Sequence, residues 1–92
     1  MLRFVWDRDK AAANLRKHGV AFDEAATTFG DPLSLTVPDP EHSVGEQRCL
    51  LVGESVTGRL LVVAHAERGD EIRIISARLA TRGERETYEE DQ

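Results

Sequence analysis

The sequence predicts an α+β fold, in which a small antiparallel sheet follows two short helices and precedes a third. Several short stretches alternate apolar and polar residues with period two, which is typical of half-buried strands. The connections between the last three of these stretches are too short for a crossover helix, so the strands are expected to be antiparallel. Helix start signals occur in the first third of the chain and again after the last strand.

Length and composition favour one compact globular domain over residues 1–92. The chain is 40% hydrophobic and 32% charged, unlike a disordered protein. It contains no apolar run near the roughly 20 residues that span a bilayer, and its N-terminus lacks the apolar core of a signal peptide. We therefore expect a cytoplasmic protein without a membrane segment. The single cysteine, Cys49, cannot form an internal disulfide, and its apolar neighbours indicate a small buried residue rather than a nucleophile.

The first 19 residues predict a strand followed by a helix. Residues 2–6 alternate well enough for a short strand. Asp7 has the chemistry of an N-cap for a helix that begins at Arg8, and Gly19 is suited to the left-handed residue that ends it. His18 then lies in the last turn, where the helix dipole favours positive charge, so it is expected to be structural.

A second helix is predicted to begin at Asp23 and to end before the Gly-Asp-Pro sequence of residues 30–32. A strand over residues 33–37 follows, and a surface loop over residues 38–43 then carries an exposed histidine, His42. The aromatic part of the core is expected to consist of Trp6, Phe22 and Phe29.

Three strands and a helix complete the predicted fold. The strands span residues 47–54, 59–67 and 71–79. The middle strand is apolar on both faces over residues 60–64, which predicts that it is buried. Thr81 and Glu84 have the spacing of a capping box, so the last helix should begin just after the last strand.

The net charge of −5 argues at first against nucleic acid, but the charges are unevenly distributed. Residues 1–47 carry 5 positive and 8 negative charges, residues 48–85 carry 7 and 5, and residues 86–92 carry 0 and 4. Only the middle section is net basic. Whole-chain charge therefore does not exclude an RNA-binding protein.

The stretch 72–88 passes from a strand into a helix and carries four arginines and a tyrosine. The guanidinium group of arginine presents several N–H donors in a planar arrangement that matches phosphate oxygens. Arginines held at a rigid strand-to-helix junction could therefore bind a phosphodiester. The alternative is a solvated surface with local ion pairs. Simple strand alternation puts Arg73 and Arg78 on opposite faces of the sheet, and His65 on the face of Leu61 and Val63.

The chain resembles the BrnT toxins of bacterial toxin–antitoxin pairs, which share the RelE-like ribonuclease fold. The resemblance covers nearly the whole sequence and rests on the order and spacing of these residues: Trp6-Asp7, Lys10, Asn14-Leu15, His18-Gly19-Val20, Phe22, Asp31-Pro32, Glu46-Gln47-Arg48, Gly58 to Val63, His65, Ile72 to Arg78, Ala80-Thr81, Glu84-Arg85 and Tyr88.

This resemblance implies an RNA-cleaving toxin that needs no metal or other cofactor and acts by attack of a ribose 2′-hydroxyl on the adjacent phosphate. Such a reaction needs a proton acceptor, a proton donor and positive charge on the phosphate. Among the residues of this chain, the implied acid–base candidates are His65 and Tyr88. The candidates for binding phosphate or stabilising its charge are Arg48, Arg73, Arg78, Arg82 and Arg85. The resemblance also implies that Gly83 and Glu86 occupy positions that are commonly basic in the family, so this chain lacks two possible phosphate contacts.

The resemblance also implies a partner, a BrnA-type antitoxin that covers the toxic surface and carries a DNA-binding domain. The toxin would then meet operator DNA only through the antitoxin. Two other classes of protein stay open at this point. One is a non-catalytic module that uses its arginines to bind a partner chain, and the other is a small structural protein without activity.

Overall fold

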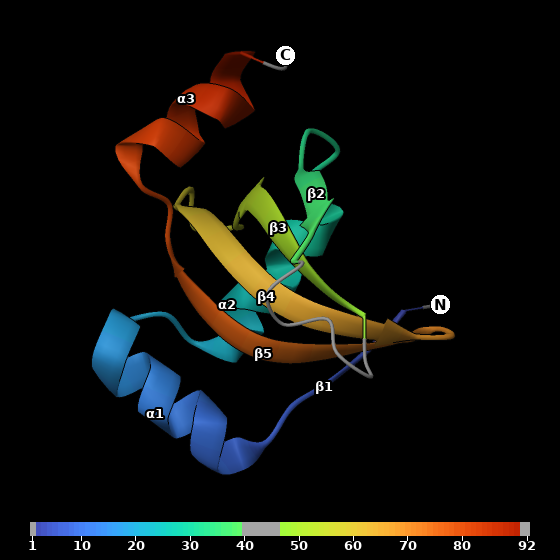
Figure 1. The fold of residues 1–92 in the computed structure, drawn as a ribbon. Coiled ribbons are helices and arrows are strands. Elements are labelled where there is room, and N and C mark those ends of the chain that lie inside the picture. Colours follow the sequence, from blue (N-terminus) through green and yellow to red (C-terminus); the bar gives the residue numbers. More distant parts are fainter. Residues whose placement is uncertain (1, 40–46, 91–92) are drawn as a thin grey trace.

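The structure is a computed structural model that describes residues 2–39 and 47–90. Its elements in chain order are β1 (Arg3–Val5), α1 (Arg8–His18), α2 (Phe22–Thr27), a 3-10 turn η1 (Thr28–Gly30), β2 (Leu35–Pro38), β3 (Arg48–Glu54), β4 (Leu60–Arg68), β5 (Glu71–Leu79) and α3 (Arg82–Glu90). The strands form one sheet in the order β1-β5-β4-β3-β2 (Figure 1). β1 runs parallel to β5, and the other neighbours are antiparallel.

The predicted α+β class is confirmed, with two helices before β2 and one after β5. The predicted start of the second helix is wrong by one residue, because α2 begins at Phe22 and its N-cap, Ala21, offers no side-chain acceptor. The last predicted turn of this helix is the tighter η1. His42 lies outside the described residues.

Local capping signals explain where α1 begins and ends and where α3 begins. The carboxylate of Asp7 accepts a hydrogen bond from the backbone N–H of Lys10 at 2.9 Å. Gly19 ends α1 with φ 69°, a left-handed conformation that strains other residues. At α3, the Thr81 hydroxyl accepts from the Glu84 N–H at 3.2 Å, and the Glu84 carboxylate accepts from the Thr81 N–H at 2.8 Å. The predicted capping box is therefore confirmed.

The core lies between the sheet and the two N-terminal helices, α1 and α2. Figure 1 shows α2 behind the sheet and α1 beside β5. β4 is the most buried strand, as predicted, with residues 60–63 at most 3% exposed. Phe22 is 2% exposed, and Trp6 meets its ring edge-on at a centroid distance of 6.0 Å. The expected aromatic share of the core is thus confirmed, since Phe29 also packs against the same cluster.

Asn14 ties α1 to the edge of β5 beyond the end of β1. Its side-chain amide donates to the carbonyl oxygens of Val20 at 2.9 Å and Ala77 at 2.8 Å, and its oxygen accepts from the Ala77 N–H at 3.1 Å. The side chain therefore pairs both backbone groups of a strand residue where no neighbouring strand is present. Asn14 is 7% exposed, so these groups would otherwise be buried without partners.

A β-bulge in β5 changes which side chains share a face. Ala64 pairs with Ser76, but the next residue, His65, pairs with Ile74, so Ile75 is left without a direct partner on β4. Residues of β5 before and after Ile75 therefore differ in parity. The bulge brings Ile74 and Ala77, three positions apart, into the same core cluster.

The bulge overturns the expectation that Arg73 and Arg78 point to opposite faces. Arg73 pairs with Ala66 and Arg78 with Val62, two β4 residues of equal parity. Directly paired residues of neighbouring strands project from the same side of a sheet. Both arginines thus lie on the face opposite the helices, which we call the second face.

Candidate nucleic-acid interface

One end of the second face carries four arginines, which we call the arginine patch: Arg3, Arg48, Arg68 and Arg73. Arg48, Ala66 and Arg73 form one row across β3, β4 and β5. Two inter-strand spacings of about 4.8 Å place the Cα atoms of the two arginines roughly 10 Å apart. The residue between them is Ala66, which is 5% exposed.

The next row of the patch contains Arg3, Glu71 and Arg68. Arg3 forms an ion pair with Glu71 at 2.6 Å. Arg68 is exposed and has no ion pair within residues 2–39 and 47–90. Asp39 extends the Arg48 row, since its backbone N–H donates to the Arg48 carbonyl at 2.9 Å, so the two rows carry four arginines and two acids, Asp39 and Glu71, a formal charge of +2. Such a concentration of positive charge attracts a phosphodiester backbone even when the whole chain is acidic.

The patch lies at the end of the sheet where the β4–β5 turn meets the start of β1 (Figure 1). The backbone N–H of Arg3 donates to the carbonyl of Asp70 in that turn at 2.8 Å. α3 lies at the other end of the sheet. Arg73 and Arg78 are separated by four residues of β4, from Ala66 to Val62, or roughly 13 Å at about 3.3 Å per residue.

Arg78 is held by α3. It donates two hydrogen bonds to the carboxylate of Glu84, at 2.7 and 2.8 Å, in a bidentate ion pair. The hydrogen bonds from Arg78 lower the pKa of Glu84 to about 2, against the opposing effect of burial. Because Glu84 also completes the capping box with Thr81, Arg78 fixes the start of α3 and has its charge neutralised.

The two arginines that belong to α3 itself, Arg82 and Arg85, lie among acidic residues. Arg82 approaches Glu86 at 3.4 Å, with exposed fractions of 93% and 63% for the two side chains, so this ion pair contributes little. Arg85 is exposed. α3 carries two arginines and four glutamates, a formal charge of −2. The alternative interpretation of local ion pairs on a solvated surface therefore describes this part of the 72–88 stretch.

Tyr88 anchors α3 to the body of the protein. It is 7% exposed, and its hydroxyl donates to the carboxylate of Asp31 at 2.6 Å. Asp31 also accepts from the backbone N–H groups of Leu33 at 2.9 Å and Glu54 at 2.8 Å. Burial opposes ionisation of Asp31, but the hydrogen bonds from Glu54 and Tyr88 hold its pKa below the ordinary value. A hollow of about 290 Å³ beside this contact is lined by Asp31 and Glu54, and these carboxylates repel phosphate.

His65 lies on the helix face of the sheet, away from the arginine patch. It is 1% exposed, and its ring meets the edge of Phe29 at a centroid distance of 4.9 Å. Neither ring nitrogen has a hydrogen-bond partner within the described residues. Burial lowers the pKa of His65, and the nearby charge of Glu67 opposes this effect only in part. The side chain is a neutral core residue that a phosphate cannot reach in this structure.

Cys49 pairs directly with His65 across β3 and β4, and it is half-buried. Burial raises the pKa of its thiol, and the charge of Glu67 adds to this effect. A raised pKa disfavours the thiolate, which agrees with the expected structural role.

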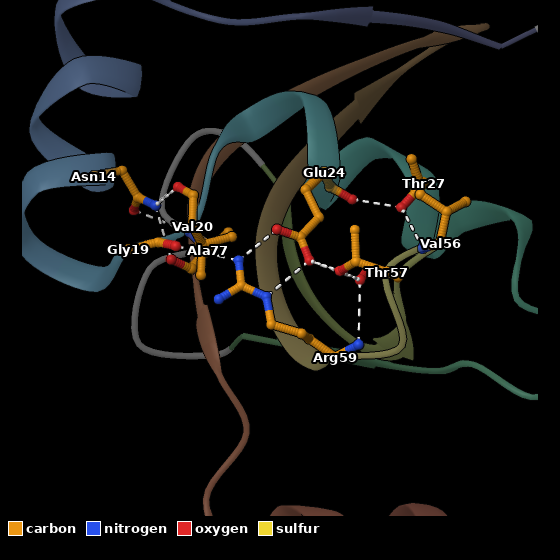
Figure 2. A network of polar contacts seen from close by, with 10 residues as sticks. Asn14, Gly19, Val20, Glu24, Thr27, Val56, Thr57, Arg59 and Ala77 are labelled. Atoms are coloured by element: carbon orange, nitrogen blue, oxygen red, sulfur yellow. Dashed lines mark hydrogen bonds and ion pairs between the residues drawn. The ribbon is translucent and has the colours of Figure 1, made fainter.

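Glu24 and Arg59 form a second charged network, on the side of the molecule that α1 and α2 cover (Figure 2). Glu24 accepts hydrogen bonds from the hydroxyls of Ser55 at 2.7 Å and Thr57 at 2.6 Å, and from Arg59 Nε at 2.9 Å. A further Arg59 nitrogen contacts Glu24 and also donates to the Gly19 carbonyl at 3.1 Å. The network joins α2, the β3–β4 turn and the end of α1.

The electrostatics of this network mark it as structural. Hydrogen bonds from Arg59 lower the pKa of Glu24 to about 2, against burial and with help from Thr57 and Ser55. The Arg59 pKa is raised by the same hydrogen bond. Both charges are thus satisfied inside the molecule.

The structure brings together only part of the site expected from the sequence. Arg48 and Arg73 share a row, whereas Arg78, Arg82, Arg85 and Tyr88 lie at the α3 end and His65 lies in the core. Arg3 and Arg68 were missed, because one stands in the first strand and the other beside a turn. The position of Arg68 could have been found from the sequence, because alternation along the strand puts it on the same face as Ala66.

Two further findings concern metals and membranes. Among the described residues, no group of three or more His, Cys, Asp or Glu side chains is arranged to hold a metal ion. In the same part of the chain, no helix has the length and apolar character needed to cross a membrane.

Comparisons with known proteins agree with the fold. A family described as the ribonuclease toxin BrnT of type II toxin–antitoxin systems matches residues 6–84. The crystal structure of the Brucella abortus ribonuclease toxin BrnT is similar, with a TM-score of 0.70 and 21% identity, over 89% of this chain and 100% of that chain. A search of curated protein sequences found no match. The family match covers most of the chain, including Arg48, Arg68 and Arg73, and the chain therefore belongs to the BrnT family of ribonuclease toxins of type II toxin–antitoxin systems.

Proposed function

We propose that the toxin cleaves RNA bound across the arginine patch, with Arg48 and Arg73 on the phosphate that reacts. The observation that carries this proposal is the row Arg48–Ala66–Arg73, which lies between the β4–β5 turn and the bulge at Ile75. Arg3 and Arg68, in the neighbouring row, would hold the adjacent backbone. This end of the sheet is favoured over the α3 end because its formal charge is positive, whereas α3 is acidic.

The proposed chemistry is attack of a ribose 2′-hydroxyl on the adjacent phosphorus: the O2′–P bond forms and the bond from phosphorus to the 5′-oxygen breaks. Solvent water takes up the proton of the 2′-hydroxyl and supplies one to the departing 5′-oxygen. Negative charge accumulates on the phosphate oxygens as the phosphorus becomes five-coordinate. Guanidinium groups that already point at those oxygens stabilise this charge more than they stabilise the bound substrate. Arginine suits the role because it stays protonated and offers paired donors. Proton transfer by His65 or Tyr88 is not part of the proposal, because neither side chain lies on the patch.

We expect the purified protein to cleave single-stranded RNA in the presence of EDTA, without any metal cofactor. The products should carry a 2′,3′-cyclic phosphate and a 5′-hydroxyl, since the nucleophile is the ribose itself. End-group analysis by mass spectrometry measures both. Cleavage that requires a divalent ion, or products with a 5′-phosphate, would disprove this mechanism. Folded protein that binds RNA but never cleaves it would favour the non-catalytic partner-binding module.

The partner is proposed to be a BrnA-type antitoxin. Membership of a type II system implies an antitoxin, and the arginine patch, in which Arg3, Arg68 and Arg73 are exposed, gives an antitoxin a surface whose occupation would exclude RNA. Through its own DNA-binding domain, such an antitoxin would bring the toxin to operator DNA.

A further inference from the structure

An apolar groove lies between α1 and the start of α2, away from the arginine patch. It has a volume of about 200 Å³ and is lined by Trp6, Ala11, Ala12, Leu15, Ala21, Phe22 and Asp23. Leu15 is 52% exposed although its side chain is large and apolar. A cavity of about 150 Å³ is enough to hold benzene, so the groove has room for one bulky apolar side chain.

The helix that forms one wall of this groove is cationic. α1 carries Arg8, Lys10, Arg16 and Lys17 against a single acid, Asp9. None of these four cations forms an ion pair within residues 2–39 and 47–90. By contrast, Arg3, Arg59, Arg78 and Arg82 all have carboxylate partners. Although the whole chain has a net charge of −5, α1 is therefore net positive.

Helical geometry places two of these cations at the groove. Arg8 lies one turn before Ala12 and Arg16 lies one turn after it, so each is a surface neighbour of a groove residue. Asp23 is the only acid in the lining. The surface thus joins an apolar slot to flanking positive charge, which is complementary to a segment that presents a bulky apolar side chain between carboxylates.

We infer that this groove binds an acidic, amphipathic segment of the antitoxin, separately from the arginine patch. The inference rests on the proposed function only in naming the antitoxin as partner. A second copy of this chain suits the groove less well, because its acidic helix α3 has Tyr88 as its one large apolar residue, and Tyr88 is buried. RNA suits it less well because the lining is apolar.

The probe is a synthetic helical peptide of about 15 residues, built from Glu, Leu and Ala, with a matched peptide in which Lys replaces Glu. Trp6 is the only tryptophan and lines the groove, so its fluorescence reports binding. We expect the acidic peptide to bind at least about tenfold more tightly than the basic one at low salt. Leu15→Asp should weaken binding by about tenfold or more, because the apolar contact is lost and like charge is introduced.

The matched control is Leu33→Asp, the same change at a leucine that is 49% exposed and lies outside the groove lining. This variant should bind the acidic peptide as the wild type does. Equal affinity for the two peptides, no binding of the acidic peptide, or full binding by Leu15→Asp would each overturn the inference. A dimer that Leu15→Asp dissociates would also overturn it, in favour of a second copy.

RNA cleavage by the same variants separates this inference from the proposed function. Leu15→Asp should cleave RNA at the wild-type rate. Loss of cleavage with peptide binding retained would assign the groove to RNA and overturn the inference. If the wild type binds the peptide but does not cleave RNA, the proposed function fails and the groove inference stands.

Discussion

At the scale of single residues, His65 has the chemistry of a catalytic group but lies in the core, where it cannot act as one. A histidine at the end of a strand is a reasonable proton acceptor for RNA cleavage, and strand parity correctly placed it with Leu61 and Val63. The same parity places His65 on the face that α1 and α2 cover, whereas the arginine patch lies on the second face. Both ring nitrogens are buried without hydrogen-bond partners among the described residues, so the ring serves only to fill space in the core.

His65→Leu is expected to retain RNA cleavage and to fold as stably as the wild type or more so. The change removes two unsatisfied polar atoms and keeps similar volume, so the stability change should stay within about 1 kcal/mol or be favourable. Because burial lowers the His65 pKa from 6.5, its unfolded form takes up a proton first, and stability is lost as pH falls below about 6.5. Urea unfolding against pH should show a flatter profile for the variant. Loss of cleavage at unchanged stability would restore His65 as a catalytic residue.

Glu24 makes a separate contribution to acid stability. Its pKa in the folded protein is about 2, below the ordinary 4.5, so its contribution is complete above pH 4.5 and is lost as pH falls towards 2. Glu24→Gln should cost about 1 to 3 kcal/mol at neutral pH, because hydrogen bonds to a charged group are lost. The cost should shrink between pH 4.5 and 2, as measured by urea midpoints. Asp23→Asn, at an exposed neighbour, is the control. An equal cost at both ends of this range would contradict the assignment.

At the scale of elements, local chemistry was readable from the sequence and long-range pairing was not. Asp7, Gly19 and the Thr81–Glu84 pair act within one helical turn, so their roles could be predicted. The bulge at Ile75 could not be predicted from the sequence, because the apolar pattern continues through it. Only the pairing with β4 reveals the shift in register. The parallel pairing of β1 with β5 joins the two halves of the chain, and no local signal specifies it.

Helix α3 is expected to depend on the contact between Tyr88 and Asp31. Tyr88→Phe removes a hydroxyl that donates to a carboxylate at 2.6 Å, a loss of about 1.5 to 3 kcal/mol. Most of this loss should be local, because α3 has only one buried residue. Amide hydrogen exchange should therefore accelerate in α3 and stay slow in β4. The control Glu89→Ala, at an exposed position of the same helix, should change neither. Lost RNA cleavage with normal protection of α3 would instead give the Tyr88 hydroxyl a chemical role.

At the scale of the whole molecule, positive and negative side chains are concentrated at opposite ends of the sheet. The arginine patch occupies the end near the β4–β5 turn, and the acidic helix α3 occupies the other. The two faces are also distinct, since the helices cover one and the patch lies on the other. In the proposed function, RNA binds at the patch end because the formal charge there is positive, whereas α3 is acidic. The distribution along the sequence hinted at this arrangement, but the fold was needed to locate the patch.

The most direct test compares RNA cleavage by arginine variants from the two ends of the sheet, in EDTA and at equal folded fraction. Arg48→Ala and Arg73→Ala should each lower the rate by roughly 10² to 10³, the usual effect of removing one preorganised donor. Arg82→Ala and Arg85→Ala, from α3, should leave the rate unchanged. The free energy of unfolding from urea titration should change by less than about 0.5 kcal/mol for Arg73→Ala, because Arg73 is exposed. Full activity in the two patch variants, with activity lost in the α3 variants, would contradict the proposal and place the reaction at the other end of the sheet.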